Sequence, residues 1–296
     1  MIQRLFLFLV LLAVSLAAAP YTRIVAFGDS LTDNGNLYAL SGGTYPPSPP
    51  YFGGRGTNGP VAVEYLSTAF GVPLLDFAVY GATTGIGNIL DMGTPASSNG
   101  LPGVLTAYNN ALMNGFSVSP TDLYVILGGP PNDFRASGFS LASLQTALTN
   151  QITLVSLLQA QGAQNIILGG IPDLGLLPYT LQLGPAASLA ASQFSALYNS
   201  ELAANLPAGV RFFDTSAVLY SALGDPSFTN KTDPCFDGMS VCANPEQYVF
   251  WDDFHPTTRV HEIAGQALAA TAIPEPAAII TVASGLALIV LRRRRA

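Results

Sequence analysis

The chain has few positively charged residues. Of its 296 residues, 11 are Lys or Arg, and Lys231 is the single lysine. Five of these cations stand at the two ends of the chain, so residues 20–273 carry six Lys plus Arg against seventeen Asp plus Glu, a net of −11. A surface with this balance repels phosphate backbones and offers no basic face to anionic lipid. The composition therefore argues against nucleic-acid binding.

Cysteine and histidine are also scarce, with two of each and no Cys-x-x-Cys pair. This scarcity argues against a structural zinc site, and we expect neither a metal nor an organic cofactor. Cys235 and Cys242 lie in a stretch rich in Gly and Asp. In an exported protein such a pair predicts a disulfide that closes a short surface loop.

The N-terminus predicts export. Residues 1–19 combine Arg4, an apolar run over residues 5–16 and three alanines at 17–19, which is the pattern of a cleaved signal peptide. A permanent N-terminal anchor is the alternative, but the apolar run is short for a bilayer. Residues 20–272 then remain for one α/β domain, a length that can bury a full core.

The C-terminus carries a second candidate signal. Pro-Glu-Pro at residues 274–276 precedes an apolar run over 277–291 and four arginines at 292–295. The run is marginal for a membrane-spanning helix, and the arginines would stay on the cytoplasmic side. This order resembles the PEP-CTERM sorting signal of Gram-negative bacteria. The resemblance implies that a sorting peptidase removes residues 273–296 and releases the protein to the cell surface or extracellular matrix, so that only the terminal segments meet the membrane. A plain C-terminal membrane anchor is the alternative.

Between the two ends, short apolar runs alternate with helical patterns, which predicts βα units and a parallel sheet. The predicted strands are Thr22–Phe27, Leu74–Tyr80, Leu123–Leu127, Asn165–Gly169 and Val210–Asp214. Apolar residues spaced by three or four predict helices over residues 60–70, 141–158 and 194–202. Residues 44–59, rich in Pro and Gly, are predicted to form a loop, either a functional one or a plain surface excursion.

Three residues could form a nucleophilic site. Ser30 follows the first predicted strand in Phe-Gly-Asp-Ser-Leu, at the sheet edge where open α/β folds bind ligands. Taken alone, this short motif is equally compatible with a solvated turn serine. Near the end of the domain, Asp252 and His255 are three residues apart. A serine needs a base to activate it, and the base needs a carboxylate to orient it. The other histidine, His261, falls in a predicted helix and is interpreted as structural.

Taken together, these residues resemble the GDSL lipase/esterase, or SGNH hydrolase, family over residues 24–270. Ser30 matches the nucleophile of the family, and Asp252 and His255 match its closing Asp-x-x-His. Gly81 and Asn132 match the residues that complete the oxyanion hole with the Ser30 amide. The resemblance implies a three-layer α/β/α sandwich around a mostly parallel five-stranded sheet, flavodoxin-like, and acyl transfer without a metal or cofactor. Gly81 as a simple turn glycine and Asn132 as a helix cap remain alternatives.

The sequence departs from the family pattern at two positions. Pro130 stands where the third block has glycine, and Asp76 stands where asparagine is common before the second block. Pro130 and Pro131 fix their own φ and disfavour helix for the residue before each. They predict that the chain entering Asn132 is extended and stiff.

Three functions are compatible with these residues. The first is an exported serine hydrolase of carboxylic esters, with a small-molecule, lipid or carbohydrate ester as substrate. The second is a surface esterase or acyltransferase that acts on O-acyl groups of exopolysaccharide. The third is a catalytically inactive surface-binding protein, which only the altered third block supports.

Overall fold

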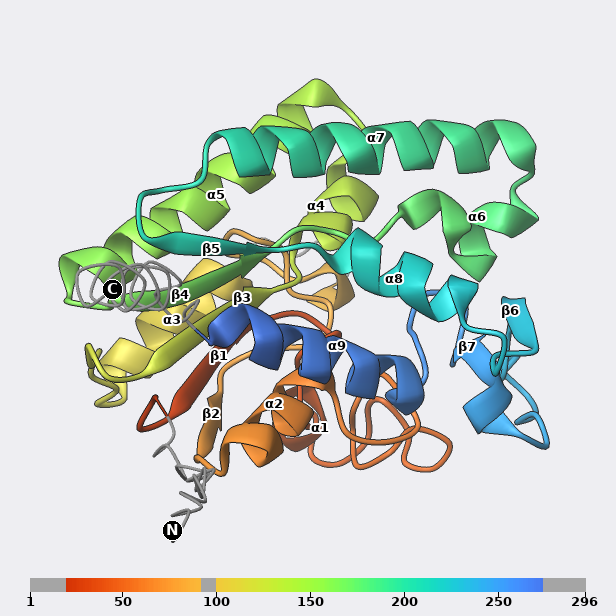
Figure 1. The fold of residues 1–296 in the computed structure, drawn as a ribbon, viewed down its shortest axis with the longest axis horizontal. Coiled ribbons are helices and arrows are strands. Elements are labelled where there is room, and N and C mark those ends of the chain that lie inside the picture. The colour runs from red at the N-terminus through yellow and green to blue at the C-terminus, as the bar shows by residue number, and fades with distance from the viewer. Residues whose placement is uncertain (1–19, 92–99, 274–296) are drawn as a thin grey trace, which may run out of the picture.

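Five parallel strands form the centre of the computed structural model, which describes residues 20–91 and 100–273 (Figure 1). Their order is β2-β1-β3-β4-β5. β1 and β3 are buried along their whole length because helices cover both faces of the sheet. The strand bounds are β1 Ile24–Gly28, β2 Leu74–Asp76, β3 Leu123–Leu127, β4 Asn165–Gly169 and β5 Val210–Phe213.

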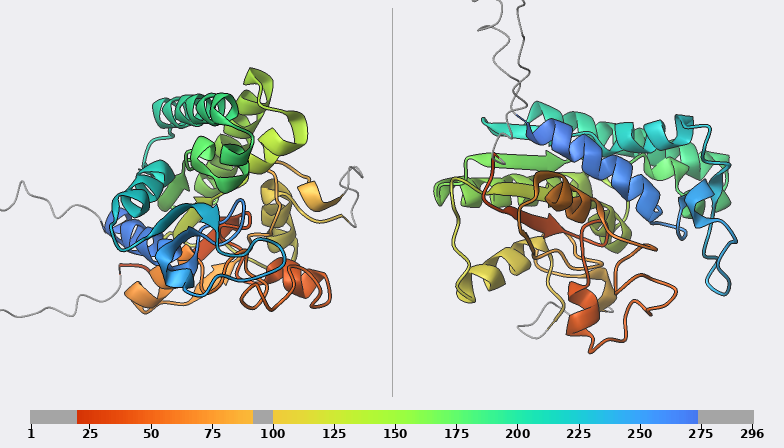
Figure 2. Two further views of the ribbon diagram at one scale, coloured as in Figure 1. Left: turned by 90° about the vertical axis from the view of Figure 1, so that its right-hand side faces the viewer. Right: turned by 60° about the horizontal axis from the view of Figure 1, so that its bottom comes forward.

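Two helical layers complete the sandwich (Figure 2). One layer contains α2 (Ala62–Phe70), α8 (Thr215–Gly224) and α9 (Thr258–Ala272), which pack together. The other contains α3 (Val104–Met113), α5 (Leu141–Ala160) and α7 (Pro185–Ala204). Shorter elements join them: α1 Asn36–Leu40, η1 Ile89–Asp91, α4 Pro130–Ser137, η2 Leu174–Leu176, α6 Pro178–Gln182, β6 Asn230–Pro234, η3 Pro245–Gln247 and β7 Tyr248–Phe250. The predicted three-layer α/β/α fold is confirmed, with all five strands of the sheet parallel.

The second strand is shorter than the sequence predicts. β2 ends at Asp76, whereas the apolar run predicts strand as far as Tyr80. The Asp76 carboxylate accepts the amides of Ala78 at 2.9 Å and Asn34 at 3.0 Å. These bonds to a side chain interrupt the regular strand geometry, and the chain then turns over the carboxyl end of β1.

The prediction of an extended chain entering Asn132 is wrong. Pro130 and Pro131 occupy the first two positions of α4, and Asn132 is its third residue. Proline is tolerated there because amides in the first turn of a helix have no intrahelical acceptor. Gly129, at φ 102°, is the N-cap, so Asn132 is not the cap either.

The order of the strands explains where a site can form. In a flavodoxin-like sheet of order 2-1-3-4-5, the chain leaves β1 and β3 toward opposite faces, and a crevice opens beyond their carboxyl ends. Ser30 follows β1 and Asn132 follows β3, so both lie at this crevice. The small parallel sheet of β6 and β7, which precedes Asp252, lies at the same end of the molecule (Figure 1).

The first and last described segments meet at the opposite end of the molecule, near the amino ends of β1 and β5. The Tyr21 hydroxyl donates to the carbonyl of Ala272, and the Arg211 guanidinium contacts both groups at 3.0 and 2.7 Å. The predicted signal peptide and nearly all of the predicted sorting segment lie outside the described residues. Within the described ranges, no helix has both the length and the apolar character to span a bilayer.

Candidate active site

Ser30, His255 and Asp252 form a continuous hydrogen-bonded chain. The His255 Nε2 lies 2.8 Å from the Ser30 Oγ. The His255 Nδ1 lies 2.8 Å from each oxygen of the Asp252 carboxylate. All three residues are less than a tenth exposed. Because a carboxylate only accepts, Nδ1 carries the proton and Nε2 is left to accept the serine proton.

The Asp-x-x-His spacing has a local cause. One oxygen of Asp252 accepts the amides of Phe254 and His255, each at 2.8 Å, which fixes a tight turn. The Trp251 amide closes this turn by donating to the carbonyl of His255 at 2.7 Å. The same carboxylate therefore shapes the backbone of the turn and orients the imidazole that the turn carries.

The electrostatics of Asp252 favour its charged form. Burial alone would raise the pKa of this carboxyl. The charge of His255 and the hydrogen bonds from His255, the Phe254 amide and the Tyr51 hydroxyl together outweigh burial. They lower the pKa of Asp252 below its ordinary value. Asp252 is therefore ionised at neutral pH, as a partner of an imidazolium must be.

Two buried aspartates hold the loop that carries Ser30. Asp29 accepts the amides of Leu31 at 3.0 Å and Gly129 at 2.7 Å, which ties the end of β1 to the start of α4. Asp33 accepts the amide of Tyr80 at 2.7 Å, which ties the same loop to the segment before Gly81. Burial raises the pKa of both aspartates, and hydrogen bonds from backbone amides oppose this effect.

At two positions of this site only glycine fits, because atoms of other segments lie where a Cβ would stand. A Cβ on Gly28 would lie 1.9 Å from the carbonyl oxygen of Leu127, so only glycine lets β1 pass β3 here. Gly81 has φ +80°, and a Cβ on it would lie 2.6 Å from Oδ1 of Asn88. Among the described residues, the amides of Ser30 and Gly81 donate to no acceptor. They are the donors available for an oxyanion.

The Asn132 side chain lies between the nucleophile block and the Gly81 block. Its Nδ2 donates to Asp29 at 3.1 Å and to the Ala82 carbonyl at 2.9 Å. The Ala82 carbonyl can only accept a hydrogen bond, and this fixes the Asn132 amide with its nitrogen toward the two oxygens. Both N–H groups are therefore engaged in the structure, and the role of Asn132 as a third oxyanion donor stays a prediction.

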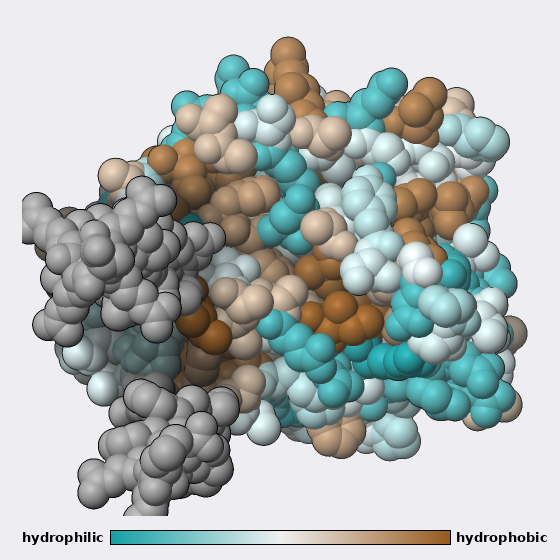
Figure 3. All heavy atoms as spheres, in the orientation of Figure 1, coloured by the Kyte–Doolittle hydropathy of each residue, from teal (hydrophilic) through white to brown (hydrophobic). Residues whose placement is uncertain are grey.

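A cavity of about 500 Å³ extends from Ser30 and His255. Apolar side chains at the ends of β3, β5 and β7, around η2 and α6, and on α8 and α9 supply most of its lining: Leu127, Leu174, Leu177, Leu183, Phe213, Val218, Leu219, Phe250, Val260 and Ala264. His261 also lines it, and burial lowers the pKa of this imidazole to about 3. His261 is thus neutral at any working pH. The face that contains α7, α8 and α9 mixes hydrophobic and hydrophilic side chains (Figure 3).

The loop of residues 44–59 lies against the turn of residues 252–255. The Tyr51 hydroxyl donates to Oδ2 of Asp252 at 2.7 Å, and Thr57 donates to the carbonyl of Pro256 at 2.8 Å. A Cβ on Gly56 would lie 3.2 Å from Cδ2 of His255. The loop therefore contributes to the site, and the alternative of a plain surface excursion is wrong. Its aromatic content was the only signal of this in the sequence.

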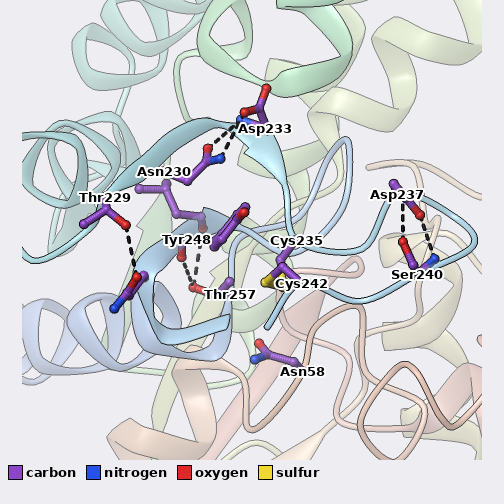
Figure 4. Close-up of a disulfide and its surroundings, with 12 residues drawn as sticks. Asn58, Thr229, Asn230, Asp233, Cys235, Asp237, Ser240, Cys242, Tyr248 and Thr257 are labelled. Atoms are coloured by element: carbon purple, nitrogen blue, oxygen red, sulfur yellow. Dashed lines mark hydrogen bonds between the residues drawn. A yellow bond between two sulfur atoms is a disulfide. The ribbon is translucent and has the colours of Figure 1, made fainter. Parts of the chain in front are cut away.

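The disulfide borders the same turn. Cys235 and Cys242 are joined, and the Cys242 amide donates to the carbonyl of Cys235 at 2.7 Å (Figure 4). The Phe236 amide donates to the carbonyl of Trp251, the residue before Asp252, at 2.6 Å. The Phe236 ring also packs edge-on against Tyr51, with 5.7 Å between ring centroids. The loop closed by the disulfide thus contacts both Tyr51 and Trp251, the residue that leads into the turn of residues 252–255.

Sequence reasoning missed two side chains at the site, Arg135 and Phe254. Arg135 lies on α4 and lines the cavity, with its Cζ 4.4 Å from the centroid of the Phe254 ring. Its spacing of three from Asn132 places both on one face of a helix. That signal was hidden because the prolines predicted an extended chain. In the described part of the chain, no cluster of His, Cys, Asp and Glu could hold a metal ion.

The sequence profile of the GDSL-like Lipase/Acylhydrolase family matches residues 24–268. The chain belongs to this family. It is 28% identical to a phosphatidylcholine-sterol acyltransferase of Aeromonas hydrophila, over 87% of this chain and 89% of that protein. It is also 28% identical to a thermolabile hemolysin of Vibrio parahaemolyticus, over 82% of this chain and 62% of the hemolysin. A solved GDSL-family protein of Veillonella parvula aligns with a TM-score of 0.48 and 13% identity, over 84% of this chain and 96% of that one.

Membership in the family establishes the coarse activity. The protein is a hydrolase of ester bonds. Its relatives include esterases, lipases and an acyltransferase, so the family alone leaves the acyl chain and the alcohol of the substrate open.

Proposed function

We propose that the protein is an exported serine esterase for esters of medium or long acyl chains, with Ser30 as nucleophile, His255 as base and Asp252 as the residue that orients it. The supporting geometry is the 2.8 Å contact from Ser30 to His255 and the contacts of the same length from His255 to Asp252. The order of groups, nucleophile to base to carboxylate, is the order that acyl transfer requires.

The chemistry proceeds in two steps. The Ser30 Oγ attacks the ester carbonyl carbon while His255 Nε2 takes its proton, and the imidazolium then protonates the departing alkoxide. Water attacks the acyl-enzyme with His255 again as base, which releases the acid and restores the serine. The free amides of Ser30 and Gly81 bind the oxyanion in both steps, and Asn132 is proposed as a third donor.

The apolar cavity carries the proposal for the acyl chain. An acetyl group would leave most of a 500 Å³ space with apolar walls empty. Each buried methylene of a longer chain contributes about 0.8 kcal/mol. The relative from Aeromonas hydrophila acts, by its name, on phosphatidylcholine, which carries long acyl chains. The cavity therefore favours a lipid-type ester over an O-acetyl group on a polysaccharide.

A series of nitrophenyl esters tests this proposal. We expect kcat/KM to rise by about tenfold for every two methylenes that the cavity buries, and to level off once the cavity is full. Ser30→Ala should abolish the activity on every ester in the series. A preference for acetate over longer chains would overturn the acyl-chain proposal, while activity that survives Ser30→Ala would overturn the assignment of the nucleophile.

We propose further that residues 1–19 direct export and that residues 273–296 are removed at the cell surface. The supporting patterns are the apolar runs and the arginines of the two ends. Mass spectrometry of the protein recovered from cell fractions tests this. An intact C-terminus on cytoplasmic protein would overturn it.

A further inference from the structure

Arg135 is the only Lys or Arg among the described residues that line the cavity. It extends from α4 one turn beyond Asn132, and its side chain is exposed. A residue that is exposed and also lines the cavity lies at the opening. Three exposed apolar side chains also line the cavity, namely Phe139, Tyr179 and Leu183. The opening therefore combines one positive charge with apolar surface.

The guanidinium of Arg135 has unused hydrogen-bonding capacity. Arg23 pairs with Asp122 and Arg55 pairs with Glu64. The other described arginines, Arg211 and Arg259, donate to carbonyl or hydroxyl oxygens, and Arg259 also pairs with Asp225 at 3.9 Å. Arg135 alone among the described arginines makes no hydrogen bond or ion pair with any described residue.

The contact with Phe254 orients this free cation. The Arg135 Cζ lies over the Phe254 ring, 4.4 Å from its centroid, which is a cation–π contact. The ring provides no oxygen acceptor, so the N–H groups of Arg135 remain available, in the fork that matches a carboxylate or phosphate. Phe254 is the residue before His255, and it packs at 4.8 Å on Tyr179. The guanidinium of Arg135 is thus held against the residue that precedes His255.

We infer that Arg135 binds an oxyanion carried by the alcohol portion of the substrate, and that this oxyanion is the phosphodiester of a glycerophospholipid. The inference rests on the proposed function, since it assumes that the acyl chain enters the apolar cavity and the ester lies at Ser30. The alcohol portion then remains at the opening, beside Arg135. On a domain whose net charge is −11 over residues 20–273, an unpaired arginine at this place attracts an anion that the rest of the surface repels.

Matched substrates test the inference. A lysophospholipid and a monoacylglycerol with the same acyl chain, short enough to stay monomeric, differ in the phosphodiester group. We expect Arg135→Gln to lower kcat/KM for the lysophospholipid by about tenfold, mostly through KM, and to change the monoacylglycerol value by less than about threefold. In about 1 M NaCl the preference of the unmodified protein should shrink, because the Debye length falls to about 3 Å.

Arg259→Gln is the matched control. Arg259 also stacks on a phenylalanine, Phe228, at 4.3 Å, but it does not line the cavity. The control should leave the ratio of the two kcat/KM values unchanged. Arg135→Lys should restore part of the preference, since it keeps the charge and loses the fork.

A binding measurement separates failure of this inference from failure of the proposed function. Ser30→Ala protein is titrated with an ether-linked lysophospholipid and with an alkylglycerol that has the same alkyl chain. Neither compound contains a carboxylic ester that could be hydrolysed. The inference is supported if the phosphodiester compound binds more tightly than the alkylglycerol and if Arg135→Gln abolishes this difference, even if no ester is cleaved. Equal binding of the two compounds, or a preference that survives Arg135→Gln, overturns it.

Discussion

The hydroxyl of Tyr51 donates a 2.7 Å hydrogen bond to Oδ2 of Asp252, across 201 positions of sequence. Burial and the nearby carboxylate raise the pKa of this phenol, so it remains a donor throughout the working pH range. The bond stabilises the charged form of Asp252. Tyr51 is therefore placed as a positioning residue, which acts on His255 through the carboxylate.

We predict that Tyr51→Phe lowers kcat/KM by about tenfold, because a hydrogen bond to a charged group is typically worth about 1.5 kcal/mol. Loss of the donor should raise the pKa of Asp252, so activity on the acid side should disappear at a higher pH than in the unmodified protein. A pH profile of kcat/KM for the two proteins checks both effects. Unchanged acid-side behaviour would mean that Tyr51 only packs the loop.

Tyr220→Phe provides the matched control. The Tyr220 hydroxyl also donates to a carboxylate, Asp173, at 2.8 Å, and that bond raises the pKa of the phenol to about 12. Tyr220 does not line the cavity. The same removal of one hydroxyl should therefore leave the pH profile of activity unchanged.

The hydrogen bond between Ser30 and His255 predicts that the two residues act as a unit. Ser30→Ala and His255→Ala should each reduce esterase turnover by about 10⁴-fold or more, and the double variant should be no worse than the single ones. Steady-state kinetics on one nitrophenyl ester checks this. Losses that multiply would show that the two side chains serve separate steps.

Much of this architecture could be predicted from local patterns. β3 and β4 have the predicted bounds, because a short, mostly apolar run flanked by turn residues is typical of a buried strand. The contacts of Ser30 with His255 could be expected from the order of the motifs. The contact of Tyr51 with Asp252 could not, because neither composition nor spacing encodes which residue of a loop reaches a turn 201 positions away.

The prolines before Asn132 show a different limit. The steric rule that disfavours helix before proline is correct on average, yet α4 begins at Pro130. Gly128 and Gly129, both at positive φ, make the bend that lets the helix start there. The position of the two prolines at the start of a helix outweighed their general tendency to disfavour helix. Because the helix was not predicted, Arg135 was not recognised as a residue of the site.

The disulfide is predicted to matter for activity as well as stability. Replacing Cys235 and Cys242 by Ser should lower the free energy of unfolding by about 2–3 kcal/mol, the amount expected for a short closed loop. Phe236 would then hold Trp251 and Tyr51 less firmly, so kcat should fall by a few fold. Urea unfolding and kinetics of the double variant check the two effects. Stability loss with full activity in the folded protein would limit the disulfide to a structural role.

Asp133 gives a prediction for the pH dependence of stability. Burial raises its pKa from 3.8 to about 6, against hydrogen bonds from Thr84. The folded state thus binds this proton more tightly than the unfolded chain, and its stabilising effect is lost as pH rises through about 6. Relative to Asp133→Asn, the unmodified protein should lose about 1–2 kcal/mol of unfolding free energy between about pH 4.5 and 7.5.

Urea unfolding of both proteins at the two pH values checks this difference. Asp29, Asp33 and Asp76 also have raised pKa values, but they are common to both proteins and cancel in the comparison. Parallel changes of stability in the two proteins would place the proton elsewhere.

Asn132 decides how many donors the oxyanion hole has. Its Nδ2 already donates to Asp29 and to the Ala82 carbonyl, and the bond to Asp29, at 3.1 Å, is the longer of the two. The oxyanion that forms on the substrate carbonyl at Ser30 is alkoxide-like and therefore a stronger acceptor than a carboxylate, so we expect the amide to donate to it in the transition state. Asn132→Ala should then lower kcat by about 10²–10³-fold with little change in KM. Asn132→Asp keeps the size of the side chain without the donor, and it should be at least as impaired. A loss below about threefold in Asn132→Ala would leave the Ser30 and Gly81 amides as the working donors and assign Asn132 to holding the two loops together.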